Sequence, residues 1–75
     1  MSEGRRYTGV VKFFSLTRGY GFITPADGGR DVFVHVTAVN RAGIVSLDPG
    51  MRISYVLEPA RDGRGQQAAE LQLLD

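Results

Sequence analysis

The sequence predicts an all-β domain, a small barrel or sandwich built from five short strands. Runs of strand-like residues alternate with turn clusters at short spacing along the whole chain, and this pattern is typical of such folds. The 75 residues are enough for one domain and leave no room for a second, so residues 1–75 are expected to fold as a single unit. A domain of this size buries only about 60% of the surface of its unfolded chain, so its stability is expected to be marginal.

The predicted strands span residues 6–14, 20–24, 31–35, 52–58 and 66–74. In the first strand, Gly9 predicts a bulge or bend. Pro25 opens a Pro-Ala-Asp-Gly-Gly turn between the second and third strands, because proline presets the entry and glycine supplies positive φ. Residues 36–50 lack a clean periodicity and end in another turn, Asp-Pro-Gly.

The fourth and fifth runs differ in how clearly they indicate strands. In the fourth run, Ile53, Tyr55 and Leu57 alternate with polar residues. The fifth run is rich in Gln, Ala, Glu and Leu, which favour helix by intrinsic propensity. Its two inner leucines, Leu71 and Leu73, nevertheless alternate with polar neighbours, and nine residues are too few for a stable isolated helix. We therefore predict a fifth strand.

The second and third strands are expected to gather their aromatic side chains on one face. Tyr20 and Phe22 share a face of one strand, and Phe33 and His35 share a face of the next, because side chains alternate between the two sides. The opposite faces carry glycine and aliphatic residues. A flat ring surface beside Arg18 would suit unstacked nucleobases, since every base has a π face and every nucleotide a phosphate.

The competing interpretation is that these rings fill the core. Aromatic residues are favoured in strands, and in a small β domain most of them are core residues. Nine aliphatic residues are already sufficient to fill a small barrel: Val10, Val11, Ile23, Val32, Val34, Ile53, Leu57, Leu71 and Leu73. The rings at positions 20, 22 and 33 are therefore expected to be surplus to the core.

Charge and composition narrow the function classes. A net charge of +1 argues weakly against a large phosphate-contact term. Lys12 is the only lysine among nine basic residues. The preference for arginine suits nucleic-acid binding, because arginine stacks on bases and clamps phosphate, although genome composition would also explain it.

The absence of cysteine excludes disulfides and thiolate metal sites and suits a reducing compartment. We expect no cofactor, no apolar signal segment, no membrane association and a cytoplasmic location.

Four segments in order resemble the bacterial cold-shock domain. RGYGFI (18–23) and VFVH (32–35) match the two ribonucleoprotein motifs of this family, GVVKFF (9–14) resembles its opening strand, and SLDPG (46–50) resembles the segment before its fourth strand. Each match alone is weak, whereas all four at the right separations are highly specific. The likeness extends from residue 9 to about residue 73. It implies a five-stranded antiparallel OB-fold barrel that binds single-stranded RNA and DNA.

The resemblance also implies which residues bind. Base stacking is implied for Phe13, Tyr20, Phe22, Phe33 and His35, and contacts with the nucleic-acid backbone or base edges for Lys12, Arg18 and Arg64. For Lys12 the alternative is a solvated charge on a strand, and Arg64 lies in a loop whose alignment needs an extra residue. Phe13 and Phe14 are adjacent, so alternation does not decide which one faces out; the family pattern favours Phe13, with Phe14 nearer the core edge.

Four positions depart from the family pattern. Phe13 stands where a tryptophan is usual and Ser15 where an asparagine is usual, while Val36 and Ile44 replace aromatic residues. Because stacking of one base on an aromatic ring is worth about 1–3 kcal/mol, we expect the mode of binding to survive with a changed affinity and footprint near Val36 and Ile44.

His35 and Asp31 are the residues that other chemistry would use. A single histidine without cysteine cannot build a structural zinc site, and no nucleophile is placed to use it as a base. Stacking with partial positive charge is the functional interpretation of His35, and simple exposure is the alternative. Asp31 is expected to start its strand and to hold Arg30 or the loop.

The leading hypothesis is therefore a non-catalytic single-strand binder. By resemblance it would be an RNA chaperone and a regulator of transcription or translation of the cold-shock type. Without an ATP-binding motif it would melt weak structure by trapping open strands. A peptide-docking barrel is the second hypothesis, and an enzyme is the third. We expect a monomer, with strand exchange hinged at residues 36–50 as the alternative.

Overall fold

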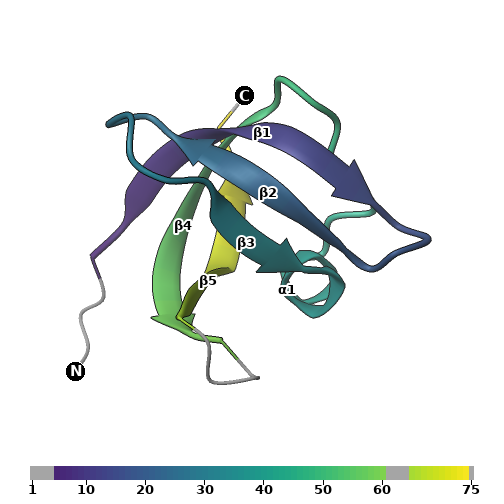
Figure 1. Ribbon diagram of the computed structural model, residues 1–75. Helices are drawn as coiled ribbons and strands as arrows, with labels where there is room; N and C mark the ends of the chain where they lie inside the picture. Colours follow the sequence, from purple (N-terminus) through teal and green to yellow (C-terminus); the bar gives the residue numbers. More distant parts are fainter. Residues whose placement is uncertain (1–4, 61–64, 75) are drawn as a thin grey trace.

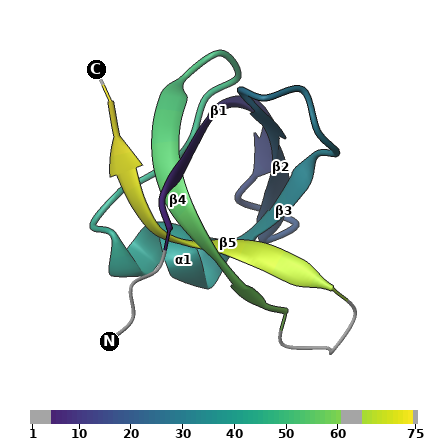
Figure 2. The same ribbon diagram turned by 90° about the vertical axis from the view of Figure 1, so that its left-hand side faces the viewer.

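The computed structural model describes residues 5–60 and 65–74. Its elements are β1 (Tyr7–Ser15), β2 (Tyr20–Pro25), β3 (Val32–His35), α1 (Val36–Arg41), β4 (Arg52–Pro59) and β5 (Gln66–Leu73). The strands form a closed barrel in the order β1-β2-β3-β5-β4 (Figures 1 and 2). This confirms the predicted all-β, five-stranded barrel. No helix among the described residues combines the length and apolarity needed to cross a membrane.

One strand pairing differs from the predicted antiparallel barrel. β5 pairs antiparallel with β4 but parallel with β3, through Phe33 opposite Gln67 and Val34 opposite Ala68. The cause is the connection between β3 and β4. The chain passes through α1 and a long loop before β4 begins, and β4 and β5 return as an antiparallel pair, so β5 meets β3 in the same direction (Figure 1).

The helix α1 was not predicted, because six residues carry too little periodicity to reveal it. His35 caps its N-terminus: the side-chain Nδ1 of His35 accepts a hydrogen bond from the backbone N–H of Thr37 at 3.2 Å. Such a cap satisfies one of the donors that the first turn of a helix leaves unpaired. Ala38 and Val39 are buried, so α1 packs its inner side against β3 and β5 at one end of the barrel.

The core contains most of the aliphatic residues that the sequence assigned to it. Buried members are Val11, Ile23, Val34, Ile53 and Leu71, and half-buried members are Val32 and Leu57. The assignment was wrong for Val10 and Leu73, which are 40% and 44% exposed. Val10 lies on the outer side of β1, beside the inward Val11, and Leu73 is the last residue of β5. Val39, Leu47 and Tyr55 complete the core instead.

Gly9 marks a close approach and not the predicted bulge. It is paired regularly with Pro25 on one side and Ile53 on the other. A Cβ atom there would lie 2.7 Å from Cγ2 of Ile23. The irregularity of β1 falls instead between Val11 and Phe13.

A second bulge, in β5, holds Glu70 in the left-handed region. Ser54 pairs with Gln72 and Val56 with Ala69, so two residues of β5 face Tyr55 alone. Glu70 has φ 49°, a conformation that usually belongs to glycine at a bulge of this kind. Its carbonyl oxygen accepts a hydrogen bond from the guanidinium of Arg6 at 2.6 Å.

Replacing Glu70 by glycine is therefore expected to stabilise the fold. A left-handed non-glycine residue costs roughly 1–2 kcal/mol, and the added chain entropy of glycine offsets about 0.5–1 kcal/mol of that relief. We expect a net gain of up to about 1 kcal/mol in urea unfolding. The contact with Arg6 is retained, because it uses the backbone carbonyl. Glu70→Val is the control and should destabilise; a gain for Val equal to that for Gly would show that φ is not the cause.

Candidate nucleic-acid interface

Five rings form a continuous surface on the outer side of β1, β2 and β3, here called the ring face: Phe13, Tyr20, Phe22, Phe33 and His35. Strand register brings them together, since Tyr20 is opposite His35 and Phe22 is opposite both Phe33 and Phe13. The centroids of Tyr20 and Phe33 are 5.8 Å apart in a stacked arrangement. Phe22 meets Phe33 edge-on at 5.9 Å, and His35 lies 6.3 Å from Phe33.

The ring face lies outside the core. The strands β2 and β3 turn Gly21, Ile23 and Val34 inward, where all three are buried. The rings themselves are exposed or half-buried. The structure therefore agrees with the expectation that these rings are surplus to the core. Of the three tyrosines, only Tyr55 is fully buried.

A bulge in β1 decides which of the two adjacent phenylalanines faces out. The register shift between Val11 and Phe13 leaves Lys12 and Phe13 both exposed, although they are consecutive in the chain. Phe14 then turns inward and packs against the core. This is the arrangement that the family pattern favoured. Sequence alternation alone could not resolve it, because a bulge breaks the two-residue period.

Lys12 is engaged with a carboxylate at the edge of the ring face. Its Nζ lies 2.9 Å from Oδ2 of Asp31, and the hydroxyl of Thr24 donates to Oδ1 of the same residue at 3.2 Å. The hydrogen bond from Lys12 is the main cause of the lowered pKa of Asp31. Asp31 thus holds Lys12, whereas the sequence led us to expect Arg30 or the loop.

Thr24 and Asp31 were missed as neighbours of the predicted site, although the signal was present. They continue the alternation of the aromatic residues by one step on each strand, from Phe22 to Thr24 and from Phe33 to Asp31. Side chains two residues apart share a face. The outer surface of β2 and β3 therefore runs from rings at one end to a hydrogen-bonded ion pair at the other.

The remaining predicted site residues, Arg18 and Arg64, and the departing position Ile44 lie in different settings. Arg18 is exposed in the turn between β1 and β2, where its backbone N–H donates to Oγ of Ser15 at 3.1 Å. Ile44 is half-buried and packs against the core. Arg64 lies outside the described residues.

His35 has a structural role that the sequence did not reveal. Its Nδ1 is 3.0 Å from the hydroxyl of Thr37 and accepts from the Thr37 backbone N–H. With Nδ1 acting as an acceptor, the proton of a neutral imidazole resides on Nε2. One residue thus caps α1 and supplies a ring to the surface. Within residues 5–60 and 65–74, no group of three or more His, Cys, Asp or Glu side chains could hold a metal ion.

Comparison with known proteins places this arrangement in a family. Residues 7–74 match the "Cold-shock" DNA-binding domain. A probable cold shock protein, y4cH, of Sinorhizobium fredii is 51% identical over 65 residues, which cover 87% of this chain and 94% of the relative. The cold shock-like protein CspA of Bordetella pertussis is 45% identical over 67 residues, covering 89% and 97%. The cold shock protein CspA of Rhizobium meliloti is 47% identical over 58 residues, covering 76% and 84%. The match over nearly the whole chain confirms the resemblance seen in the motifs: the chain belongs to the cold-shock domain family of nucleic-acid-binding domains.

Proposed function

We propose that this protein binds single-stranded RNA and DNA without catalysing a reaction, and that the ring face stacks on unpaired bases. The observation that carries the proposal is the cluster of five rings outside the core, on three adjacent strands. Each base offers a π face of the same kind, so such a surface binds with little regard to sequence. Lys12 and Arg18 at its edges would meet phosphates or base edges.

In the cell the protein would act as an RNA chaperone and a regulator of transcription or translation in a stress response. Stacking on the ring face requires bases released from their partners, so binding would trap open strands and shift weak duplexes toward the melted state. We place this activity in the cytoplasm and assign it to a monomer. A peptide-binding barrel is the less favoured function, because proline-rich peptides need an aromatic-lined groove, whereas the five rings lie over one continuous strand surface.

The expected result of a titration is that a single strand binds and its duplex does not. A fluorescent heptauridylate, the same strand annealed to its complement, and a heptathymidylate are compared at two salt concentrations. Both the ribose and the deoxyribose strand should bind, because stacking and phosphate contacts do not need the 2′-hydroxyl. Equal affinity for strand and duplex would contradict the ring-face proposal.

Removal of the Asp31 carboxylate is expected to increase the electrostatic share of binding. In the free protein Lys12 is paired with Asp31, which reduces its availability to a phosphate. Asp31→Asn should steepen the log–log dependence of affinity on salt by up to about 0.7, the contribution of one phosphate contact to a single strand. Lys12→Gln is the matched control and should make the dependence shallower. An unchanged slope in Asp31→Asn would show that Lys12 does not contact phosphate.

The pH dependence of this pair has a defined sign. The pKa of Asp31 is lowered in the folded state, so the pair is present at neutral pH and is lost only as the pH falls through that lowered pKa, below the ordinary carboxylate value of about 4. Experiments near pH 7 therefore compare the intact pair of the wild type with the variant that lacks it.

A further inference from the structure

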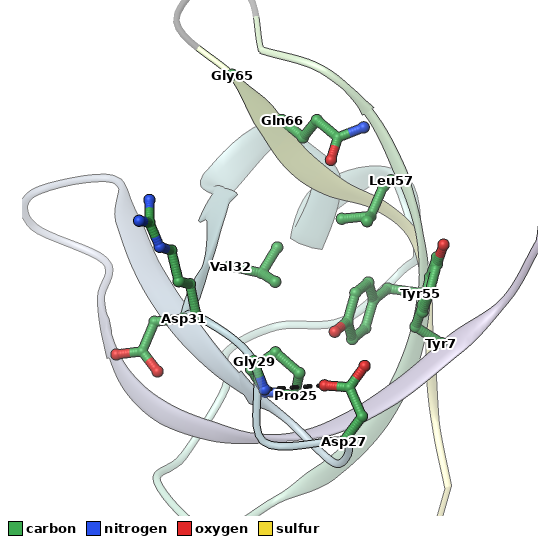
Figure 3. A pocket seen from close by; sticks show the side chains of 11 residues that line it. Tyr7, Pro25, Asp27, Gly29, Asp31, Val32, Tyr55, Leu57, Gly65 and Gln66 are labelled. Carbon is green, nitrogen blue, oxygen red and sulfur yellow. Dashed lines mark hydrogen bonds between the residues drawn. The ribbon is translucent and has the colours of Figure 1, made fainter.

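A hollow lies at the end of the barrel opposite α1, outside the ring face. Its volume is about 430 Å³, within the usual range for small-molecule sites. Every strand contributes to the wall: Tyr7 from β1, Pro25 from β2, Val32 from β3, Tyr55 and Leu57 from β4, and Gln66 from β5 (Figure 3). The hollow is therefore the mouth of the barrel itself, here called the mouth cavity.

The mouth cavity combines apolar walls with the oriented carboxylate of Asp27; Asp31, the other acidic residue of the lining, is paired with Lys12. Val32 and Leu57 supply the apolar part, and Tyr55 lines the cavity with a side chain that is only 1% exposed. Oδ1 of Asp27 accepts a hydrogen bond from the backbone N–H of Gly29 at 2.9 Å, which fixes the carboxylate in its turn. Figure 3 shows the carboxylate of Asp27 and the hydroxyl of Tyr55 on the same side of the cavity. Burial, and then the charge of Asp27, raise the pKa of Tyr55, so its hydroxyl remains a donor at neutral pH.

A second, smaller hollow adjoins the first and has the opposite charge. Its volume is about 280 Å³, and it shares Tyr7, Pro25 and Asp27 with the mouth cavity. Arg5 and Arg6 line it. The guanidinium of Arg6 donates to Ser54 and Glu70, while that of Arg5 lies 5.6 Å from the centre of the Tyr7 ring. Guanidinium groups bind phosphate well, so Arg5 is placed to meet an anion.

These two adjoining hollows define the chemistry of a ligand. A simple organic cation would suit Asp27, but three arginines, Arg5, Arg6 and Arg30, also line the two hollows and disfavour a cation. A ligand with N–H donors at one end and a phosphate at the other would suit both hollows, the donors facing Asp27 and the phosphate facing Arg5. Among the nucleobases, guanine presents two neighbouring donor groups, N1–H and N2–H₂, beside the acceptor O6, so it complements a carboxylate next to a hydroxyl donor.

We propose that the mouth cavity is a nucleotide site in which Asp27 accepts from the N1–H and N2–H₂ groups of guanine, Tyr55 donates to its O6, and Arg5 binds its phosphate. The shared chemistry is a guanine nucleotide, which is either a free mononucleotide or the 5′-phosphorylated end of a strand. This site is separate from the ring face and does not depend on the function proposed for it.

The first test is a nuclear magnetic resonance titration of the full chain with GMP, AMP, CMP and UMP. GMP should shift the amide signals of Asp27 and Gly29 and the ring signals of Tyr55, and AMP should bind at least about tenfold more weakly, the loss expected when a charged acceptor is left without its donors. Guanosine should bind about two- to fivefold more weakly than GMP, because it lacks the phosphate. Equal shifts from all four nucleotides, or none at the mouth cavity, would overturn the proposal.

Two variants assign the contacts. Asp27→Asn keeps the oxygen that accepts from Gly29 but replaces the other with an NH₂ donor, so GMP affinity should fall by about tenfold or more. Arg5→Gln should weaken GMP by about two- to fivefold and leave guanosine unchanged. Heptauridylate binding measured on Asp27→Asn should equal that of the wild type. If the wild type did not bind heptauridylate, the function proposed for the ring face would be refuted. If Asp27→Asn bound GMP as tightly as the wild type, the nucleotide site proposed in the mouth cavity would be refuted.

Competition distinguishes the two sources of the nucleotide. A hexanucleotide of uridine with a single 5′-phosphorylated guanosine is added to the complex of the protein with isotope-labelled GMP, and the signals of the bound, labelled GMP are followed. Displacement of GMP at a lower concentration than that required by unlabelled GMP identifies a strand end as the preferred ligand. Displacement only at equal or higher concentration identifies the free nucleotide.

Discussion

A methyl group at position 21 is expected to destabilise the domain severely. Gly21 is buried in β2, opposite Phe14 of the neighbouring antiparallel strand β1. A Cβ atom there would overlap the carbonyl oxygen of Phe13 and lie 2.7 Å from Cα of Phe14. Both obstacles are backbone atoms, so no side-chain rotation relieves the overlap, and separation of β1 from β2 would break the ladder.

The expected cost of Gly21→Ala is about 3 kcal/mol or more, at or above the upper end of the range for overpacked cores. A 75-residue chain has a total stability of roughly 4–11 kcal/mol at 0.05–0.15 kcal/mol per residue, so a large part of it would be lost. Urea unfolding followed by circular dichroism measures the effect. Gly28→Ala is the control, since Gly28 has φ +84° and nothing within 4 Å of the added atom; it should cost only the backbone strain, about 1–2 kcal/mol. Equal losses for the two variants would mean that the gap between β1 and β2 adjusts freely.

Truncation of Phe33 is expected to produce the largest loss of single-strand affinity. Phe33 lies at the centre of the ring face, within 5.8–6.3 Å of the rings of Tyr20, Phe22 and His35. Its removal takes away one stacking surface and the support of its neighbours. Phe33→Ala should weaken heptauridylate binding by about 1–3 kcal/mol, or roughly 5- to 150-fold. The fold should persist, because Phe33 lies outside the core.

The control for Phe33→Ala is Leu73→Ala. Leu73 is 44% exposed at the end of β5, on a strand that carries no member of the ring face. The Leu73→Ala variant should change the affinity for heptauridylate little, although it also removes exposed apolar surface. If Phe33→Ala instead lowered the urea midpoint while the folded fraction bound with normal affinity, Phe33 would be a structural residue and the ring face would not be the binding surface.

Four of the five rings of the ring face, all except Phe13, could be predicted from the alternation of residues because that signal is local. Two short strands alternate aromatic residues with glycine and valine, and the period of a strand is fixed at two residues. Aliphatic residues elsewhere were enough for a core, which left the rings for the outside. The barrel could be predicted in the same way, because five strand-like runs separated by turn clusters are compatible with few other folds.

Features that depend on contacts between distant residues were not predicted. The bulge beside Lys12 and that at Glu70 alter the two-residue period through pairing with neighbouring strands. The short helix α1 is held by its cap on His35 and by burial of Ala38 and Val39, and neither produces a pattern long enough to recognise. The ion pair between Lys12 and Asp31 joins positions that only the strand register brings together.

The parallel contact between β3 and β5 has a consequence for how the barrel assembles. It joins Val34 to Ala68 across nearly half of the chain. Among the strand pairings of the described residues only β1 with β4, as in Tyr7 opposite Tyr55, closes a longer loop, so both closures carry a high entropic cost. By contrast, β1, β2 and β3 follow one another through short turns, and contacts between near neighbours form fastest. The ring face resides entirely on these three strands. Its assembly is therefore separable in time from closure of the barrel, and a nucleic-acid strand bound across it would tolerate transient opening of the β3–β5 pair.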